Sequence, residues 1–270
     1  MDIEVNGTRL HYTLEPGAGG PPVVLLHGYT LDRRYWEPQL PVLANRNQML
    51  VPDLRGFGDS PLGSVEVNTP DLMAEDVRAL LDRVAVREPL VLAGLSMGGY
   101  VALAFMARYP ERVRALILAD TRAPGDDENQ RRARRALADQ VEREKSTLAA
   151  REAIFPLLMA PAGYDNPELV ARVRAMAERP APAAIAATLR GLAVRADQTA
   201  LLARIEVPTL IVVGELDALT PPNDARVLHA GIPNSELIEL PGIGHLSSLE
   251  APLAFNAAVI SFLDRHRLHG

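Results

Sequence analysis

Short apolar runs recur in the first and last thirds of the chain and indicate buried β-strands. The predicted strands of this kind are Val23–Leu26, Met49–Pro52, Leu90–Ala93, Val113–Leu118, Pro208–Val213 and Glu236–Leu240. An alternating pattern on either side of Asn6-Gly7 predicts an opening β-hairpin. The fold class we expect is therefore α/β, with a mostly parallel eight-stranded sheet that has an antiparallel edge.

Stretches with apolar residues at helical spacing separate these runs. Thr69 is a favourable N-cap and Pro70 a favourable first helical residue, and the apolar positions that follow repeat every three or four residues. A second helix is predicted after Gly99, and the closing helix is predicted to start near Pro252. Strands that alternate with helices in this way are typical of a parallel sheet covered by helices on both faces.

The alternation stops between residues 122 and 202, which contain no convincing strand. Helices are predicted there over residues 130–144, 168–178 and 183–193. We expect an α/β core formed by residues 1–121 and 203–270, interrupted by a helical cap formed by residues 122–202. The arginine-rich stretch 131–135 is flanked by acidic residues, which indicates a solvated helix face.

Composition narrows the classes of partner and chemistry. The net charge of −6 gives no reason to expect nucleic acid as a partner, and the absence of cysteine excludes disulfides and thiolate chemistry. No window approaches the ~18 uninterrupted apolar residues of a membrane helix, and the first residues lack a secretory signal, so we expect a cytoplasmic location. We see no Rossmann glycine pattern, P-loop or metal cluster, so neither a cofactor nor a metal is expected.

The pentapeptide Gly94-Leu95-Ser96-Met97-Gly98 lies between a predicted strand and a predicted helix, the context of a nucleophile elbow. Ser96 would sit on a tight, strained turn, where side chains at Gly94 and Gly98 would collide. The helix that starts at once would direct free N–H groups toward the space beside Ser96. We therefore predict that Ser96 is a nucleophile.

Further chemistry-bearing residues follow other predicted strands, at His27-Gly28-Tyr29, Asp120, Asp217 and His245. The carboxyl ends of parallel strands form one rim, where open α/β sheets bind their ligands. A serine hydroxyl needs a base to remove its proton, and a histidine oriented by a carboxylate supplies one. His245 is the predicted base, while both Asp217 and Asp120 are positioned to orient it.

These features together resemble the α/β-hydrolase family, in its small, cap-bearing esterase branch. The resemblance is carried by His27-Gly28, Asp53-x-Arg55-Gly56-x-Gly58-x-Ser60, Gly94-x-Ser96-Met97-Gly98-Gly99, Gly214-x-x-Asp217 and Gly244-His245. It implies a triad of Ser96, His245 and Asp217, in preference to Asp120. It also implies an oxyanion hole formed by the backbone N–H groups of Tyr29 and Met97. The resemblance further implies that His27 is structural, and we expect Arg55 to pair with Asp53 or Asp59.

The expected function is that of a carboxylesterase acting on a small, largely apolar ester. The predicted pocket lies between the sheet rim and the cap, and its candidate residues are Leu31, Trp36, Phe155, Leu158, Met159, Leu219 and Leu246. Each of these apolar residues could instead belong to the core. A serine nucleophile argues against haloalkane dehalogenases and epoxide hydrolases, which need a carboxylate in its place.

Other functions of the same fold stay open. The nearest is a lactonase of the 3-oxoadipate enol-lactone hydrolase type, which this chain also resembles in layout. A carbon–carbon bond hydrolase, a perhydrolase and a non-catalytic ligand receptor are further alternatives. Arg33, Arg34 or Arg122 could bind a substrate carboxylate, although a surface role is favoured for each. The expected partner is a small ester or lactone, and the oligomeric state is not predicted.

Overall fold

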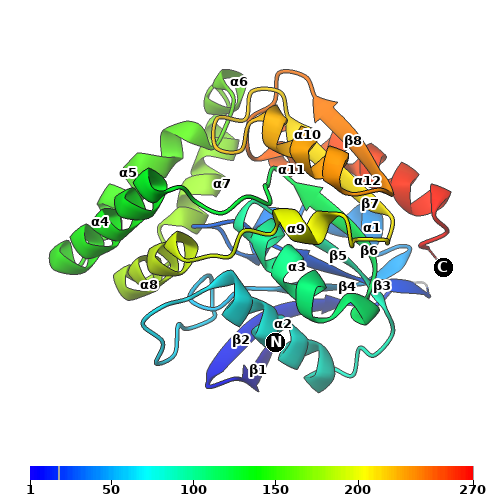
Figure 1. The fold of residues 1–270 in the computed structure, drawn as a ribbon, viewed down its shortest axis with the longest axis horizontal. Coiled ribbons are helices and arrows are strands. Elements are labelled where there is room, and N and C mark those ends of the chain that lie inside the picture. Colours follow the sequence, from blue (N-terminus) through cyan, green and yellow to red (C-terminus); the bar gives the residue numbers. More distant parts are fainter. Residues whose placement is uncertain (18, 270) are drawn as a thin grey trace.

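The computed structural model describes residues 1–17 and 19–269; Ala18 and Gly270, both within the predicted core, lie outside the described residues. Its centre is one sheet, whose strands are β1 (Asp2–Val5), β2 (Thr8–Glu15), β3 (Gly20–Leu26), β4 (Asn47–Pro52), β5 (Leu90–Leu95), β6 (Val113–Ala119), β7 (Thr209–Gly214) and β8 (Ser235–Leu240). Their order in the sheet is β1-β2-β4-β3-β5-β6-β7-β8 (Figure 1). The pairs β1–β2 and β2–β4 are antiparallel and all other pairs are parallel, which confirms the predicted mixed sheet.

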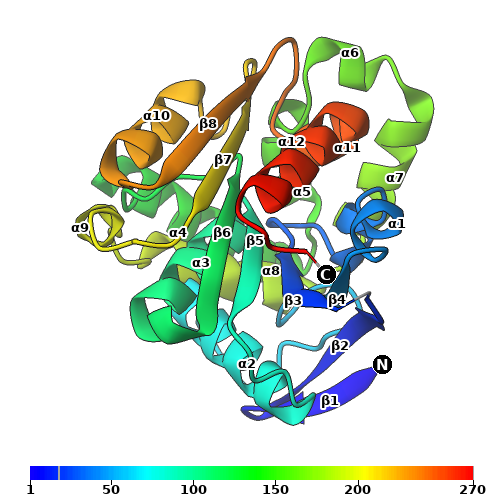
Figure 2. The ribbon, with the colours of Figure 1, turned by 90° about the vertical axis from the view of Figure 1, so that its right-hand side faces the viewer.

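The sheet divides the core into two hydrophobic clusters because successive strand residues point to opposite faces. Val24 and Leu26 of β3 belong to one cluster, and Val23 and Leu25 belong to the other. Figure 2 shows α3 and α12 on opposite sides of the sheet. The helical elements of the core are η1 (Arg33–Trp36), α1 (Leu40–Leu43), α2 (Pro70–Arg83), α3 (Met97–Arg108), η2 (Pro110–Arg112), α10 (Pro222–Gly231), α11 (Ser247–Glu250) and α12 (Pro252–Arg265).

Residues 122–202, called the cap below, contain no strand and supply a separate group of helices at one end of the sheet (Figure 1). These are α4 (Glu128–Glu144), α5 (Leu148–Ile154), η3 (Phe155–Leu157), α6 (Pro161–Tyr164), α7 (Pro167–Ala177), α8 (Pro182–Ala193) and α9 (Thr199–Leu202). The helix α4 packs along α8. The three long cap helices match the predicted ones, whereas α5 and α6 were not predicted because one or two turns leave little periodic signal.

Local capping explains where the predicted helices begin. In α2 the Thr69 hydroxyl accepts the Leu72 N–H at 3.1 Å and Pro70 occupies the first position, as predicted. In α4 the Asp127 carboxylate accepts the Gln130 N–H at 2.8 Å, and the Gln130 side chain accepts the Asp127 N–H at 3.0 Å. This capping box starts α4 two residues before its predicted start. Across residues 1–17 and 19–269, no helix combines the length and apolar character that crossing a bilayer requires.

Candidate active site

Ser96 connects the end of β5 directly to the start of α3. Its backbone torsions are φ 51° and ψ −112°, a conformation that costs a non-glycine residue about 1–3 kcal/mol. A Cβ added at Gly94 would lie 2.3 Å from the carbonyl oxygen of Gly98, and one added at Gly98 would lie 2.3 Å from that of Leu26. The turn therefore needs glycine on both sides, as its sequence predicts.

Backbone contacts with β6 hold this strained turn in place. The Ser96 N–H donates to the carbonyl oxygen of Ala119 at 2.9 Å. The Ser96 carbonyl oxygen accepts the Gly99 N–H at 2.9 Å and the Thr121 hydroxyl at 2.8 Å. Because both polar groups of its backbone are engaged, the position of the half-buried Ser96 is set by the sheet.

His245, on the loop after β8, contacts Asp217, on the loop after β7. Nδ1 of His245 lies 2.8 Å from Oδ2 of Asp217. The Thr220 hydroxyl donates to the same oxygen at 2.8 Å, and the N–H groups of Leu219 and Thr220 donate to Oδ1 at 2.8 and 3.0 Å. The ring nitrogen that remains, Nε2, is then the one that can accept a proton.

Electrostatics support a charged acid beside a basic histidine. Burial alone raises the pKa of Asp217. The charge of His245 and the hydrogen bonds that Asp217 accepts from His245 and Thr220 outweigh burial, so the net pKa of Asp217 is lowered. Burial alone lowers the pKa of His245, but the charge and the hydrogen bond of Asp217 reverse this and raise it. Asp217 is therefore ionised at neutral pH, and it stabilises the imidazolium form of His245.

We expect kcat/KM for ester hydrolysis to fall at acidic pH with a midpoint above about 6.5, the ordinary histidine value. The reason is that His245 must be neutral to accept a proton, while its raised pKa keeps it protonated to a higher pH than usual. Steady-state rates between about pH 5 and 9 measure the midpoint. A midpoint at or below the ordinary value would contradict this electrostatic description.

Asp120 is fully buried near this pair but does not take part in it. Its Oδ1 accepts the Gly214 N–H at 2.9 Å, and its Oδ2 contacts the Ser247 hydroxyl. Burial and the neighbouring charge of Asp217 raise its pKa well above the usual range of a carboxyl, which favours the neutral form of Asp120. In the structure it connects the loops after β7 and β8, and Asp217 is the carboxyl that contacts His245.

The loop after β3 lies beside Ser96. A Cβ added at Gly28 would be 3.5 Å from the Cβ of Ser96. Nδ1 of His27 donates to the Gly28 carbonyl oxygen at 2.8 Å, and Nε2 accepts the Leu54 N–H at 2.9 Å. This pair of bonds requires the neutral tautomer with its proton on Nδ1, and burial lowers the pKa of His27 accordingly. His27 thus holds the loop and has no free nitrogen for a second base.

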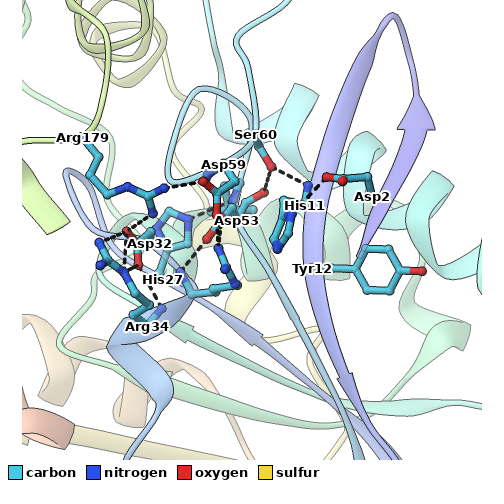
Figure 3. A network of polar contacts seen from close by, with 12 residues as sticks. Asp2, His11, Tyr12, His27, Asp32, Arg34, Asp53, Asp59, Ser60 and Arg179 are labelled. Carbon is cyan, nitrogen blue, oxygen red and sulfur yellow. Dashed lines mark hydrogen bonds and ion pairs between the residues drawn. The ribbon is translucent and has the colours of Figure 1, made fainter.

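A polar network ties this loop to the cap (Figure 3). The Asp32 carboxylate caps η1 by accepting the Arg34 N–H at 3.0 Å and lies 3.1 Å from the guanidinium of Arg179, a cap residue. Arg179 also contacts Asp59 in the loop after β4. The guanidinium of Arg33 reaches that same Asp59 at 2.8 Å. One cap arginine therefore touches both loops that support the region around Gly28.

The arginines that were candidates for a substrate carboxylate have protein partners. Arg33 pairs with Asp53 and Asp59, Arg34 pairs with Asp32, and Arg122 pairs with Asp126 at 2.9 Å. The predicted pairing of Arg55 with Asp53 or Asp59 was wrong. Arg55 is fully buried and pairs with Asp76 of α2 at 2.6 Å, because Arg33 occupies the place beside Asp53 and Asp59.

Five of the seven candidate pocket residues belong to one hydrophobic cluster on the α12 side of the sheet, and the other two, Phe155 and Leu219, are partly buried and pack against it. Trp36 lies against Phe255 of α12, with ring centroids 6.0 Å apart, so its indole packs in the core. A cavity of about 280 Å³ lies between α5, η3 and α7, and Phe155 and Leu158 are among its lining residues. Whether any of the seven binds a substrate stays a prediction.

Tyr29 and Met97 lie close to Ser96 in the fold. Met97 is the first residue of α3, so its N–H has no partner within the helix. Tyr29 follows Gly28 and is buried in the same hydrophobic cluster as Met97. Both therefore stay candidates for binding an oxyanion.

Sequence reasoning overlooked Thr220, which holds Asp217, and Thr121, which holds the Ser96 carbonyl group. A threonine three residues after an aspartate is a signal for a side-chain turn and could have identified Thr220. Sequence reasoning also overlooked Glu250, whose carboxylate accepts N–H groups on both sides of His245 and one from the cap. Within the part of the chain that the structure describes, no group of three or more His, Asp or Glu residues is arranged to hold a metal ion.

Comparisons with known proteins agree with this geometry. A family profile described as "alpha/beta hydrolase fold" matches residues 21–252. A pimeloyl-[acyl-carrier protein] methyl ester esterase of Aeromonas hydrophila is 33% identical over 251 residues, which cover 90% of this chain and 96% of that protein.

Two solved structures are also similar over nearly the whole length. One is a thermophilic esterase from Thermogutta terrifontis, with a TM-score of 0.91 and 37% identity over 96% of this chain and 94% of the other. The second is an enol-lactonase from Burkholderia xenovorans LB400, with a TM-score of 0.89 and 26% identity over 98% and 100% of the two chains. The sheet order, the elbow and the extent of these matches show that the chain belongs to the α/β-hydrolase fold family, in the branch of esterases and enol-lactonases.

Proposed function

We propose that this protein is a carboxylesterase that cleaves small, largely apolar esters through an acyl-serine intermediate. The observation that carries the proposal is the 2.8 Å contact of His245 with Asp217, on the same rim of the sheet as the strained turn at Ser96. A carboxylate on Nδ1 leaves Nε2 to act as a base, and a strained turn between a strand and a helix is the arrangement that exposes a serine hydroxyl above the sheet.

In the proposed reaction, Ser96 Oγ attacks the ester carbonyl carbon while Nε2 of His245 takes the hydroxyl proton. The N–H groups of Tyr29 and Met97 bind the oxyanion that forms, and one such donor contributes about 100- to 1000-fold to the rate. The intermediate collapses, the carbon–oxygen bond to the alcohol breaks, and His245 returns its proton to that oxygen. Water then attacks the acyl-serine, with His245 as base, and the acid leaves while Ser96 regains its proton.

Two features favour a neutral, apolar ester. The candidate pocket residues belong to one apolar cluster or pack against it, and burial of each substrate methylene against such a surface contributes about 0.8 kcal/mol. Arg33 and Arg34 are paired with aspartates, which disfavours them as partners of a substrate carboxylate. A largely apolar acyl or alkyl group therefore fits the site better than an anionic one.

A lactonase is the second candidate, and the likeness to the Burkholderia xenovorans enol-lactonase favours it. The chemistry would be the same, except that the leaving alcohol stays attached to the acyl group. The similarity to the Aeromonas hydrophila methyl ester esterase favours the first candidate, a carboxylesterase.

We expect p-nitrophenyl esters to be hydrolysed with a kcat/KM that rises from acetate toward octanoate, by up to about fourfold for each methylene that becomes buried. Neutral lactones and enol-lactones should be turned over more slowly at the same enzyme concentration. Initial rates over the whole panel measure this, with the Ser96→Ala variant as background. A preference for a lactone would support the second candidate, and binding without turnover of any ester would point to a receptor.

A further inference from the structure

Glu250, the last residue of α11, contacts both the loop of His245 and the cap. Its Oε2 accepts the Gly244 N–H at 3.2 Å and the Ala160 N–H at 2.8 Å. Its Oε1 accepts the Leu246 N–H at 3.1 Å. One carboxylate therefore holds the residues before and after His245 together with a backbone group of the cap, 90 residues away in sequence.

The cap and the loop of His245 are also packed against each other at this point. A Cβ added at Gly244 would lie 2.3 Å from the Ala160 nitrogen and 2.6 Å from the Met159 carbonyl carbon. A Cβ added at Gly163 would lie 3.0 Å from Oε2 of Glu250. The two backbones have no room for a side chain between them, so a shift of one displaces the other.

The three N–H donors favour the charged form of Glu250, against the effect of burial. A carboxylate accepts backbone N–H groups through stronger hydrogen bonds than a neutral acceptor does. Burial raises the pKa of Glu250 above its ordinary value, and the N–H groups of Ala160, Gly244 and Leu246 offset only part of that rise. An amide of the same shape has one oxygen instead of two. That oxygen should take the place of Oε2, which accepts both Gly244 and Ala160, so the amide nitrogen faces the Leu246 N–H and that bond is lost.

We propose that Glu250 is a positioning residue that couples the placement of the cap to the placement of His245. The inference rests on the proposed function, in which His245 is the base. With the cap seated, Ala160 completes the set of donors around Glu250, and Gly244 and Leu246 hold His245 against Asp217. Displacement of the cap at Ala160 removes one of these donors and loosens the loop that carries the base.

The Glu250→Gln variant should lower kcat by about 10- to 100-fold, as expected when a catalytic group is misplaced by a fraction of an ångström to 1 Å. KM should change by less than about threefold, because the lost interaction affects the chemical step. Hydrogen exchange of the cap peptide around Ala160 should be faster by about three- to tenfold, because the Ala160 N–H then donates to a neutral acceptor instead of a charged one.

The matched control is Glu239→Gln on β8. That glutamate has a half-buried side chain, 31% exposed, and pairs with Arg226 at 2.8 Å, away from the loops. The Glu239→Gln variant should leave kcat and the hydrogen exchange of the cap unchanged. Glu250→Asp is the second variant, should Glu250→Gln unfold. It keeps the charge but is one methylene shorter, so it should also lose rate because it cannot reach all three donors.

The rate at which a fluorophosphonate labels Ser96 separates this inference from the proposed function, because it needs a nucleophilic serine but no ester substrate. Slower labelling in folded Glu250→Gln, together with faster cap exchange, supports the proposal even if the wild type hydrolyses no ester. Labelling and turnover at the wild-type rate in folded Glu250→Gln would overturn it. Slower labelling with unchanged cap exchange would overturn the coupling to the cap.

Discussion

Replacing Ser96 by alanine should lower kcat/KM for the best ester by at least about 1000-fold. Without the hydroxyl no acyl-serine can form, and what remains is the attack of water assisted by the oxyanion donors. The fold should be unaffected, because Ser96 is held through its backbone contacts with Ala119 and Thr121. Alanine keeps those backbone groups.

Steady-state kinetics with the parent and variant side by side measure this loss, and thermal unfolding checks that both are folded. Ser261→Ala is a suitable control, since Ser261 is an exposed serine on α12. Mass spectrometry after treatment with a fluorophosphonate should place the adduct on Ser96 in the parent. Undiminished activity in Ser96→Ala, or an adduct on another residue, would show that Ser96 is not the nucleophile.

Asp217→Asn should lower kcat by about 10³- to 10⁴-fold, as the corresponding change does in other serine triads. The N–H groups of Leu219 and Thr220 both donate to Oδ1, so the amide oxygen should take that place. The amide nitrogen then faces Nδ1 of His245 and donates to it. This traps the tautomer with its proton on Nε2, which cannot accept the proton of Ser96.

The paired experiment is Asp120→Asn. Burial raises the pKa of Asp120 and favours its neutral form, and an amide of the same shape can replace it toward Gly214 and Ser247, so we expect a loss of less than about tenfold. We would measure kcat of both variants on the same ester and verify by circular dichroism that both are folded. The two losses then show which carboxyl orients His245. A large loss in Asp120→Asn with an active Asp217→Asn would assign the acid to Asp120 instead.

Features that depend on neighbouring residues were predictable from the sequence. The apolar runs predicted the strands, Asn6-Gly7 the hairpin, and Thr69-Pro70 the start of α2, because periodicity and capping act within a few residues. The glycines around Ser96 also follow from local sterics, since Gly94 and Gly98 are close neighbours on one tight turn. The chain order of Ser96, Asp217 and His245 predicted which side chains share one rim.

Contacts between distant segments were predicted less well. Arg55 was assigned a partner in its own loop, yet its guanidinium lies against Asp76 of α2. A long, flexible side chain reaches several carboxylates, and only packing selects one of them. Glu250 gave no signal either, because its partner in the cap is a backbone N–H group of Ala160, which any residue except proline could supply.

The sequence by itself determined the architecture, the strained turn at Ser96 and the set of residues at the rim, since these depend on local sterics and on hydrophobic periodicity. The tertiary structure decided which carboxyl contacts His245, because Asp217 and Asp120 both follow strands and differ only in their surroundings. It also decided that the surroundings of Asp120 raise its pKa, that both ring nitrogens of His27 are bonded to Gly28 and Leu54, and that Glu250 connects the cap to the loop of His245. Burial and the distances between charges set these properties, and both arise only when the chain has folded.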